Sequence, residues 1–316
     1  MNGPEVVIFG PKLSKRIGGV SVFIDNLKTK QSEFNFIHVY WSDWWKYFYK
    51  KNWHINVSSN WHYCLGIFLA IAHKRIILYF HNDRIAKNQN LLIFIERLGA
   101  RLIFVNDKQF LMHNALERSS HIPAYIRVDN ILEQSLKLKR EFNVIFSIWS
   151  FDKNTAERIY GTDLLYQLME FFKKEAIAWY LFGGENIQDW KDDIESVISE
   201  DVHVVFYENM KLVNFLSDAD LLLRLNREDG FGLVVQEALD NGCDAIASDC
   251  CKRSDNCILF ESGNIEDLKR VFRSYLIGTK DVNKTWSIPD STCKFQSINK
   301  VYKELYETVD TKTWFR

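Results

Sequence analysis

Two periodicities of apolar residues alternate along the chain. Short, nearly continuous apolar runs are typical of buried strands, and longer segments with apolar residues at every third or fourth position are typical of helices that cover a core. The predicted strands span residues 5–9, 34–39, 76–80, 101–105, 143–148, 177–182, 202–206, 220–223, 244–247 and 257–260. The predicted helices span residues 20–30, 91–99, 164–174, 233–241, 265–276 and 295–309. This alternation predicts an α/β fold with parallel sheets covered on both faces.

A polar segment without a strand, residues 127–141, interrupts the alternation, which then starts again. We interpret this segment as a connection between two Rossmann-like, doubly wound domains, the first over residues 1–135 and the second over residues 140–295. The remaining residues, 296–316, contain the last helix. Because ligands of doubly wound sheets bind at the carboxyl ends of the strands, we expect the two domains to face a common cleft.

The composition narrows the function classes. Forty Lys and Arg against 41 Asp and Glu give a formal net charge of −1, which argues against a protein that coats nucleic acid by charge alone. The six cysteines lack the spacing of a disulfide framework, which favours reduced thiols in the cytoplasm. The N-terminus lacks the pattern of a secretory leader, and the most apolar run, residues 65–72, is too short to span a membrane. We therefore expect a cytoplasmic protein, at most peripheral on the inner face of the cell membrane.

The segment from Leu221 to Asp249 carries the strongest chemical signal. It reads LLLRLNREDGFGLVVQEALDNGCDAIASD, a strand followed by a glycine-containing loop and a helix. Gly230 and Gly232 permit tight backbone geometry, and the amides of residues 232–234 at the helix start offer positive dipole ends to a diphosphate. Asp229 and Glu237 lie eight residues apart across this corner, where paired carboxylates accept hydrogen bonds from the hydroxyls of a sugar or ribose.

This segment resembles the E-x7-E region of retaining glycosyltransferases of the GT-B fold, family 4, usually written E-G-F-G-L-V-x-x-E-A-x-A-x-G. The chain reads D-G-F-G-L-V-V-Q-E-A-L-D-N-G, with Asp229 at the first acid and Glu237 at the second. The resemblance implies that Asp229 contacts the transferred sugar and that Glu237 binds the ribose of the donor nucleotide. It also implies donor contacts at Gly230, Phe231, Gly232, Leu233 and Val234. Asp in place of Glu shortens the side chain by one methylene, which bears on the identity of the sugar.

Weaker similarities extend over most of the chain. Gly18 and Gly19 resemble the family's first glycine-rich loop, near the donor phosphate and the acceptor, and His81 stands where the family carries a histidine beside the reacting sugar. The sequence FQSINKVYKELY resembles the family's last helix, which crosses back to the N-terminal domain. An ordinary tight turn at Gly18 and a structural role for His81 are the alternatives.

The cations and metals expected at such a site are less clear from the sequence. The family's Arg and Lys, which neutralise the donor diphosphate, are replaced by Thr155 and Tyr160, so we assign this role to the nearby Lys153 or Arg158, with Arg158 preferred. The D-x-D pattern from Asp218 to Asp220 falls at the entry of a strand, where we interpret it as a cap. No zinc spacing occurs among the cysteines. We expect no metal and no cofactor beyond the nucleotide-sugar co-substrate, a UDP- or GDP-sugar.

Aromatic residues are concentrated in one place. They make up 15% of the chain, and residues 40–49 read YWSDWWKYFY. One interpretation is burial against the first sheet. Another is a membrane-facing surface in which Trp44 and Trp45 lie at headgroup level while Lys50 and Lys51 meet anionic lipid. A third is a stacking platform for the rings of an acceptor sugar.

The sequence therefore predicts a metal-independent, retaining hexosyltransferase. Its donor is a nucleotide sugar, and its acceptor a lipid-linked or growing oligosaccharide in the biosynthesis of a bacterial surface polysaccharide of the O-antigen or capsule type. Two alternatives remain, a nucleotide-sugar 2-epimerase with the same fold and a non-catalytic subunit that binds a partner enzyme. The substitution at Asp229 and the absent Arg and Lys pair favour the second alternative.

Overall fold

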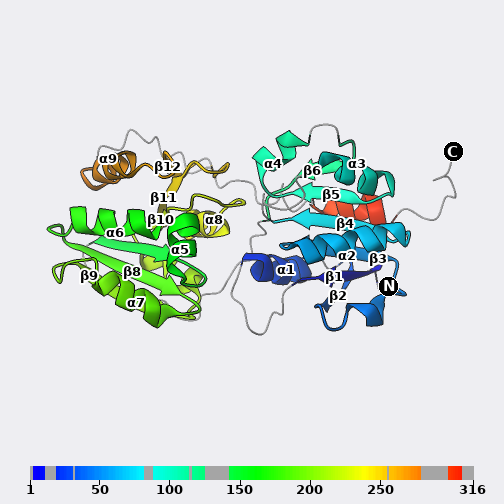
Figure 1. The fold of residues 1–316 in the computed structure, drawn as a ribbon, viewed down its shortest axis with the longest axis horizontal. Coiled ribbons are helices and arrows are strands. Elements are labelled where there is room, and N and C mark those ends of the chain that lie inside the picture. Colours follow the sequence, from blue (N-terminus) through cyan, green and yellow to red (C-terminus); the bar gives the residue numbers. More distant parts are fainter. Residues whose placement is uncertain are drawn as a thin grey trace. The chain divides into compact units, whose positions relative to one another are not determined.

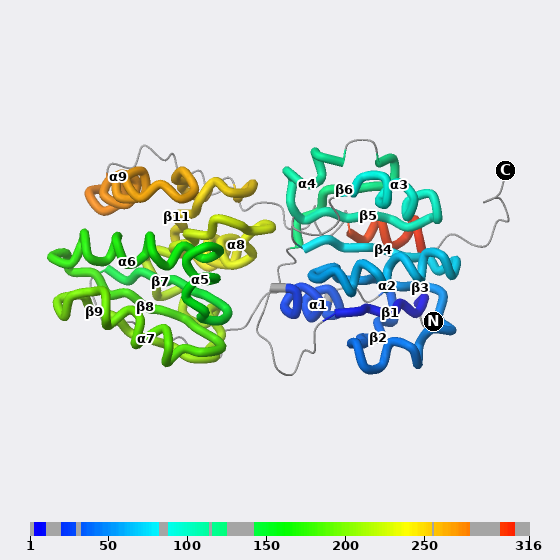
Figure 2. The backbone as a smooth tube through the Cα atoms, viewed as in Figure 1, coloured from blue at the N-terminus to red at the C-terminus, as the bar shows by residue number. Residues whose placement is uncertain are grey.

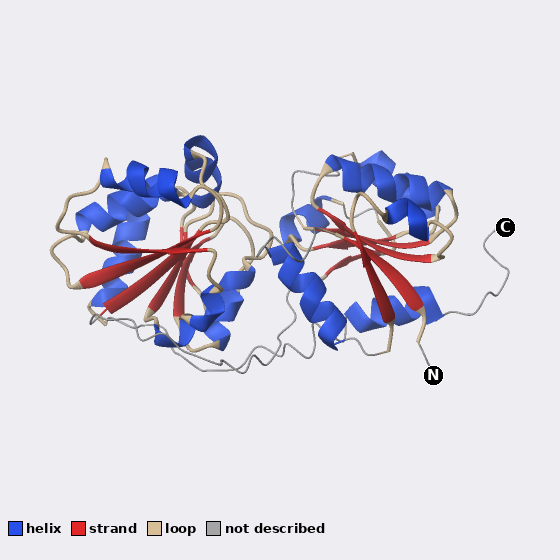
Figure 3. Cartoon of the chain, turned by 90° about the horizontal axis from the view of Figure 1, so that it is seen from below, coloured by secondary structure: helices blue, strands red, loops and turns tan. Residues whose placement is uncertain are grey.

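The computed structural model describes residues 3–10, 19–30, 33–81, 88–113, 116–124, 142–254, 256–278 and 298–307. The chain divides into two compact units: unit 1 comprises Met1–Val128 and Asp290–Arg316, and unit 2 comprises Asp129–Pro289. Each unit holds one six-stranded parallel sheet with helices on both faces (Figure 3). The predicted α/β fold with two Rossmann-like domains is confirmed.

The sheet of unit 1 has the strand order β2-β1-β3-β4-β5-β6, and all neighbouring strands are parallel (Figure 1). Its strands are β1 (Glu5–Phe9), β2 (Asn35–Val39), β3 (Asn52–Val57), β4 (Arg75–Phe80), β5 (Arg101–Phe104) and β6 (Ser119–His121). Its helices before the interdomain connection are α1 (Gly19–Lys30), η1 (Trp44–Tyr47), α2 (Asn60–Ile71), α3 (Gln89–Arg97) and α4 (Asp107–Met112). The order reverses between β1 and β3, so the carboxyl ends of these two strands flank the topological switch point, where ligands of such sheets bind.

Side chains fix where several of these helices begin. Ser59 accepts a hydrogen bond from the amide of His62, Asn88 accepts from Leu91, and Asn106 accepts from Gln109. Each satisfies an amide that the first helical turn leaves without a partner.

The C-terminal segment belongs to unit 1. Residues 298–307 are helical, including η5 (Lys303–Glu307), and η5 lies beside β4 (Figures 1 and 2). Tyr302 and Tyr306 are buried, and the Tyr306 hydroxyl donates to the carbonyl of Trp53 over 2.6 Å. At the margin, Arg101 pairs with Glu304 at 3.1 Å. A segment remote in sequence thus completes the core of unit 1.

The sheet of unit 2 has the order β12-β11-β10-β7-β8-β9, again entirely parallel. Its strands are β7 (Phe142–Ser147), β8 (Ile177–Gly183), β9 (His203–Glu208), β10 (Leu221–Arg224), β11 (Asp244–Ser248) and β12 (Ile258–Phe260). Its helices are α5 (Lys153–Thr155), η2 (Ala156–Tyr160), α6 (Thr162–Phe171), α7 (Ile187–Glu195), η3 (Leu212–Asn214), η4 (Leu216–Asp218), α8 (Leu233–Asp240) and α9 (Ile265–Leu276). The order reverses between β7 and β10, which places the switch point at their carboxyl ends.

The predicted strands agree with the structure to within two residues, but β3, β6 and helices α2, α4 and α7 were not predicted. Strand β3 interleaves His54 and Asn56 with apolar residues inside the aromatic-rich segment, so it lacks a continuous apolar run. The predicted connection, residues 127–141, lies outside the described residues. The boundary between the two units, after Val128, falls within this segment. Among the helices the structure describes, none is long and apolar enough to cross a membrane.

Candidate functional site

The loop that follows β10 forms the centre of the candidate site. β10 ends at Arg224 and α8 begins at Leu233, so the loop between them leaves the carboxyl edge of the sheet beside the switch point of unit 2. This is the position at which doubly wound sheets bind nucleotides. The structure brings Asp229, Gly230, Phe231 and Gly232 to this edge, together with the first turn of α8.

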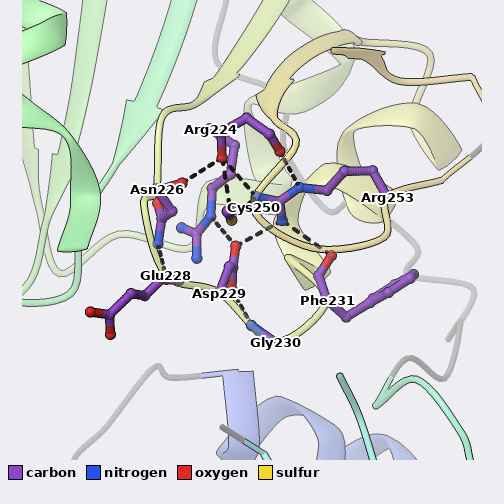
Figure 4. Close-up of polar contacts among 9 residues, drawn as sticks. Arg224, Asn226, Glu228, Asp229, Gly230, Phe231, Cys250 and Arg253 are labelled. Atoms are coloured by element: carbon purple, nitrogen blue, oxygen red, sulfur yellow. Dashed lines mark hydrogen bonds and ion pairs between the residues drawn. The ribbon is translucent and has the colours of Figure 1, made fainter. Parts of the chain in front are cut away.

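Asp229 lies between two arginines (Figure 4). Its Oδ2 accepts from Nε of Arg224 over 2.9 Å and from Nη1 of Arg253 over 2.8 Å, while its Oδ1 accepts from the Gly230 amide over 2.9 Å. Burial by itself would raise the pKa of Asp229, but the charges and hydrogen bonds of the two guanidinium groups outweigh it and hold the pKa well below its usual value. Asp229 is therefore ionised, and its carboxylate holds both arginines in place.

Gly232 is required by the geometry of this corner. Its φ of 73° lies in the left-handed region, and a Cβ would collide with Arg253 Nη1 and lie 3.1 Å from Asp229 Oδ2. Gly230, by contrast, does not adopt a positive φ, so of these two glycines only Gly232 has the left-handed backbone conformation. No side chain caps α8, and no described residue accepts from the amides of Leu233 and Val234, so the start of this helix remains available to an anion.

Glu237 lies on the second turn of α8 and is half-buried. Burial, and to a lesser degree the charge of Asp240, raises the pKa of Glu237 to about 7, against the opposing charge of Arg224. Burial has this effect because loss of hydration disfavours the charged form. Asp229 and Glu237 thus form a pair of acids with opposite tendencies, the first ionised and the second close to its titration point at neutral pH.

The two cations predicted to face a diphosphate are both on the surface. Lys153 pairs with Asp193 of α7 at 2.7 Å, and Arg158 pairs with Glu228 of the β10–α8 loop at 3.5 Å; their side chains are 57% and 58% exposed. Only Arg158 is therefore brought to the loop. Arg224 and Arg253 were not predicted from the sequence, although a charge at the end of the apolar run LLLR was a usable signal for Arg224. Arg253 lies in the loop after β11 and gave no such signal.

Helix α6 and the turn that precedes it also contact and support the loop between β10 and α8. Arg227 forms a two-pronged ion pair with Asp163, 2.7 Å at each prong, and its amide donates to the carbonyl of Ile159 over 2.9 Å. Gly161 has φ of 71° and approaches the Leu225 backbone so closely that a Cβ would lie 2.5 Å from its carbonyl oxygen. These contacts fix the backbone of the loop on both sides of Asn226, which supports precise placement of Asp229.

A second polar cluster surrounds His81 in unit 1. His81 directly follows β4, and its Nε2 lies 2.8 Å from Oδ1 of Asn56, which also lies 3.2 Å from Nε2 of His54. Asn56 Nδ2 donates to the carbonyl of Phe9 over 3.1 Å. Because a carbonyl only accepts, this bond fixes the orientation of the amide, and Oδ1 must accept from both histidines. Both rings therefore carry their proton on Nε2, and the hydroxyl of Tyr302 donates to Nδ1 of His54.

This arrangement keeps His81 neutral. Burial, with smaller effects from the charges of His54 and His62, lowers the pKa of His81 to about 3. The ring is stacked on Tyr79 at 5.0 Å between ring centres and lies against Phe23 at 5.5 Å. His81 thus presents Nδ1 as a hydrogen-bond acceptor. Gly18, the other predicted contact in this part of the chain, lies outside the described residues, and Gly19 is the first residue of α1.

The aromatic segment divides between core and surface. Trp53 is fully buried, and Trp44 packs partly buried against the core of unit 1, whereas Trp41, Trp45 and Trp61 are 54%, 62% and 68% exposed. Helix α2 adds exposed Phe68 and Ile71. These five exposed residues, with Tyr49, are called the aromatic surface below: Trp41, Trp45, Tyr49, Trp61, Phe68 and Ile71.

The basic residues at this surface differ in their partners. Lys50 forms an ion pair with Glu5, while Lys51 is exposed. Lys46 pairs with Asp43 and lies 5.7 Å from the ring centre of Trp45. Lys74 lies 4.6 Å from the ring centre of Phe48. The predicted set of Trp44, Trp45, Lys50 and Lys51 therefore contains one half-buried ring, one exposed ring, one lysine in an ion pair and one exposed lysine.

Asp220 of the D-x-D pattern has a structural role. Asp220 accepts from the amide of Asn143 over 2.7 Å, which joins the starts of β10 and β7. Among the described residues, no group of three or more His, Cys, Asp or Glu side chains is placed to hold a metal ion.

No protein-family model matches the chain, and no curated protein sequence matches it either. Solved structures are similar over the full length. Alr3699/HepE of Anabaena, determined with UDP-glucose, has a TM-score of 0.66 at 11% identity, covering 96% of this chain and 98% of that chain. Sucrose-phosphate synthase of Thermosynechococcus elongatus has a TM-score of 0.69 at 12% identity, covering 97% and 100%. WaaG, a glycosyltransferase involved in lipopolysaccharide biosynthesis, has a TM-score of 0.58 at 13% identity, covering 96% of each chain. At such identities the similarity establishes the two-domain GT-B fold.

Proposed function

We propose that the protein is a retaining glycosyltransferase that moves a hexose-type sugar from a nucleotide diphosphate to a saccharide acceptor. The observation that carries the proposal is the loop at the switch point of unit 2, which joins an ionised Asp229, Glu237 and the open start of α8 on one edge of a parallel sheet. A nucleoside diphosphate matches this edge, because its phosphates are anionic and its ribose carries paired hydroxyls.

Each group then has a chemical role. Glu237 accepts hydrogen bonds from the ribose hydroxyls. The amides at the start of α8 stabilise the charge that develops on the departing diphosphate, which is the dominant form of stabilisation for such a leaving group. Asp229 orients the donor, directly or through the arginines it holds. His81, neutral and with Nδ1 as acceptor, is suited to accept a hydrogen bond from a sugar hydroxyl.

The similar structures support the choice of donor and acceptor class. HepE of Anabaena was determined with UDP-glucose and with UDP, which favours a uridine nucleotide over a guanosine nucleotide. WaaG takes part in lipopolysaccharide biosynthesis, which favours a lipid-linked or growing oligosaccharide as the acceptor. We assign the aromatic surface to contact with that acceptor and with anionic lipid at the inner face of the membrane, because exposed Trp and Tyr beside Lys suit the headgroup region.

Ligand binding and product analysis test the proposal. Wild-type protein should show a higher unfolding temperature with UDP or a UDP-sugar, because a ligand that binds the folded state stabilises it by mass action. No shift with any UDP or GDP compound contradicts the proposal. With a donor that raises the unfolding temperature, NMR of the product should show the same anomeric configuration as the donor. The opposite configuration would contradict a retaining mechanism.

The two alternatives make different predictions. A 2-epimerase releases an isomerised nucleotide sugar without any acceptor, which chromatography of the nucleotide pool detects. A non-catalytic subunit is favoured by the engagement of Asp229 with two arginines. Slow donor hydrolysis by the purified protein, lost in Glu237→Ala, excludes that alternative.

A further inference from the structure

The geometry points to Arg224 as the side chain that binds the diphosphate of the donor, with Asp229 and Arg253 as the residues that position it. The inference rests on the proposed function for the identity of the ligand. It assigns the cationic role to a residue of β10 and takes it away from Lys153 and Arg158, the two that the sequence suggested. It is carried by the hydrogen bonds of the two guanidinium groups that share Asp229 (Figure 4).

All three guanidinium nitrogens of Arg253 form hydrogen bonds within the protein. Its Nε donates to the Ser248 carbonyl over 3.0 Å, Nη1 donates to Asp229 and to the Phe231 carbonyl, and Nη2 lies 3.3 Å from both Ser248 Oγ and Cys250 Sγ. Its side chain is 1% exposed. A guanidinium with all its nitrogens bonded and no access to solvent serves as a structural support of the loop.

Among the described residues, the guanidinium of Arg224 has a hydrogen-bond acceptor for Nε only. Its Nε donates to Asp229 over 2.9 Å, and no described residue accepts from Nη1 or Nη2. Its side chain is 17% exposed, and the two terminal nitrogens have four N–H donors to offer to a ligand. The fork of two Nη groups matches two oxygens of a phosphate.

The position of Arg224 suits a donor bound along α8. The residue ends β10 at the switch point, and its charge lowers the pKa of Glu237, the proposed ribose ligand, against the larger effect of burial. Asp229 accepts a hydrogen bond from Nε of Arg224 and not from its Nη groups. The carboxylate therefore orients the guanidinium and leaves Nη1 and Nη2 available to a ligand. Lys153 and Arg158, in contrast, are more than half exposed, and each forms an ion pair with an acid, Asp193 and Glu228 respectively.

Calorimetric titration of purified full-length variants with UDP, uridine and inorganic pyrophosphate tests the inference. Arg224→Gln should weaken the binding of UDP and of pyrophosphate by roughly 10- to 100-fold, because the charged contacts with the phosphates are lost. The affinity for uridine should stay within about twofold of wild type. Arg158→Gln and Lys153→Gln are matched controls, which should bind all three probes within about twofold of wild type. Unchanged UDP and pyrophosphate binding by Arg224→Gln overturns the inference, as does an equal loss for uridine, which indicates a merely structural role.

A measurement on wild-type protein covers the case in which Arg224→Gln does not fold. With 15N-labelled arginine, pyrophosphate and UDP should shift the Nη signals of Arg224 and leave those of Arg253 in place, and the absence of any Arg224 shift at saturation overturns the inference. The outcomes also separate the two proposals. If UDP binds without involving Arg224, the inference fails while the proposed function stands. If pyrophosphate binds through Arg224 but no nucleotide does, the inference stands while the proposed function fails.

Discussion

At the scale of single residues, the environment of each acid and base decides its role more than its type does. Asp229 and Glu237 are both carboxylic acids at one loop, but two guanidinium groups keep the first ionised, and burial brings the pKa of the second to about 7. His81 is neutral because it is buried and shares the Asn56 amide oxygen with His54. These states define which groups can donate and which can accept when a ligand binds.

Glu237 should make the stability of the protein depend on pH near neutrality. Its pKa rises from 4.5 in the unfolded chain to about 7 in the folded protein, so the folded state favours the protonated form. Its contribution to stability is fully present below pH 4.5 and is lost as the pH rises to 7. Glu237→Gln should therefore stabilise the ligand-free protein at pH 8 by at most about 3 kcal/mol, with little effect at pH 4.5. Urea unfolding at the two pH values measures this difference, and equal effects at both contradict it.

His81 should not titrate between pH 5 and 8. With a pKa of about 3 it remains neutral in this range, and 15N NMR of labelled histidine should show the proton on Nε2 and a lone pair on Nδ1. Asn56→Asp places a carboxylate against the same ring nitrogen and should raise the pKa of His81 by about 1 to 3 units. A wild-type ring with its proton on Nδ1, or one that titrates near pH 6.5, contradicts the assignment.

At the scale of elements, strand ends and helix starts determine what the site contains. β10 ends where the order of its sheet reverses, and α8 starts at Gly232, whose left-handed φ and lack of a Cβ let Arg253 and Asp229 pack against it. In unit 1, η1 and α2 carry rings that point both into the core and outward, so one aromatic segment serves the fold and also forms a surface.

The aromatic surface should bind anionic vesicles without contributing to stability. Trp45→Ser combined with Trp61→Ser removes two exposed rings and should reduce sedimentation with phosphatidylglycerol vesicles about tenfold or more, while the unfolding free energy changes by less than about 1 kcal/mol. Trp53→Ala is the control for a core ring and should cost about 3 to 5 kcal/mol. Unchanged vesicle binding by the double variant contradicts the assignment to lipid and leaves the saccharide acceptor to be tested by the same variant.

At the scale of the whole molecule, the chain builds two Rossmann-like units and returns to the first with its last helix. The buried rings of Tyr302 and Tyr306 lie on the core of unit 1, and Tyr302 also donates to His54, which shares Asn56 with His81. The C-terminal helix therefore supports the polar cluster around His81 as well as the core. Solved structures with 11 to 13% identity keep this architecture over at least 96% of the chain, since many sequences satisfy one pattern of buried layers.

Loss of a C-terminal tyrosine should destabilise unit 1 selectively. Tyr306→Ala removes a buried ring and its hydrogen bond to the Trp53 carbonyl, at a cost of about 3 to 5 kcal/mol. Differential scanning calorimetry should show one part of the unfolding transition at lower temperature, and UDP should still raise the temperature of the remaining part. A uniform shift of a single transition would mean that the two units unfold together.

The sequence by itself determined the fold class, most strands and the location of the candidate site, because apolar periodicity reflects burial and the motif from Asp229 to Glu237 is local in the chain. Tertiary structure alone decided the partners. Arg253 comes to Asp229 from the loop after β11, Asn56 joins His54 to His81 across neighbouring strands, and Trp44 and Trp45 separate into a half-buried and an exposed ring. These outcomes depend on contacts between residues far apart in the chain and on desolvation, and neither quantity is encoded in local spacing.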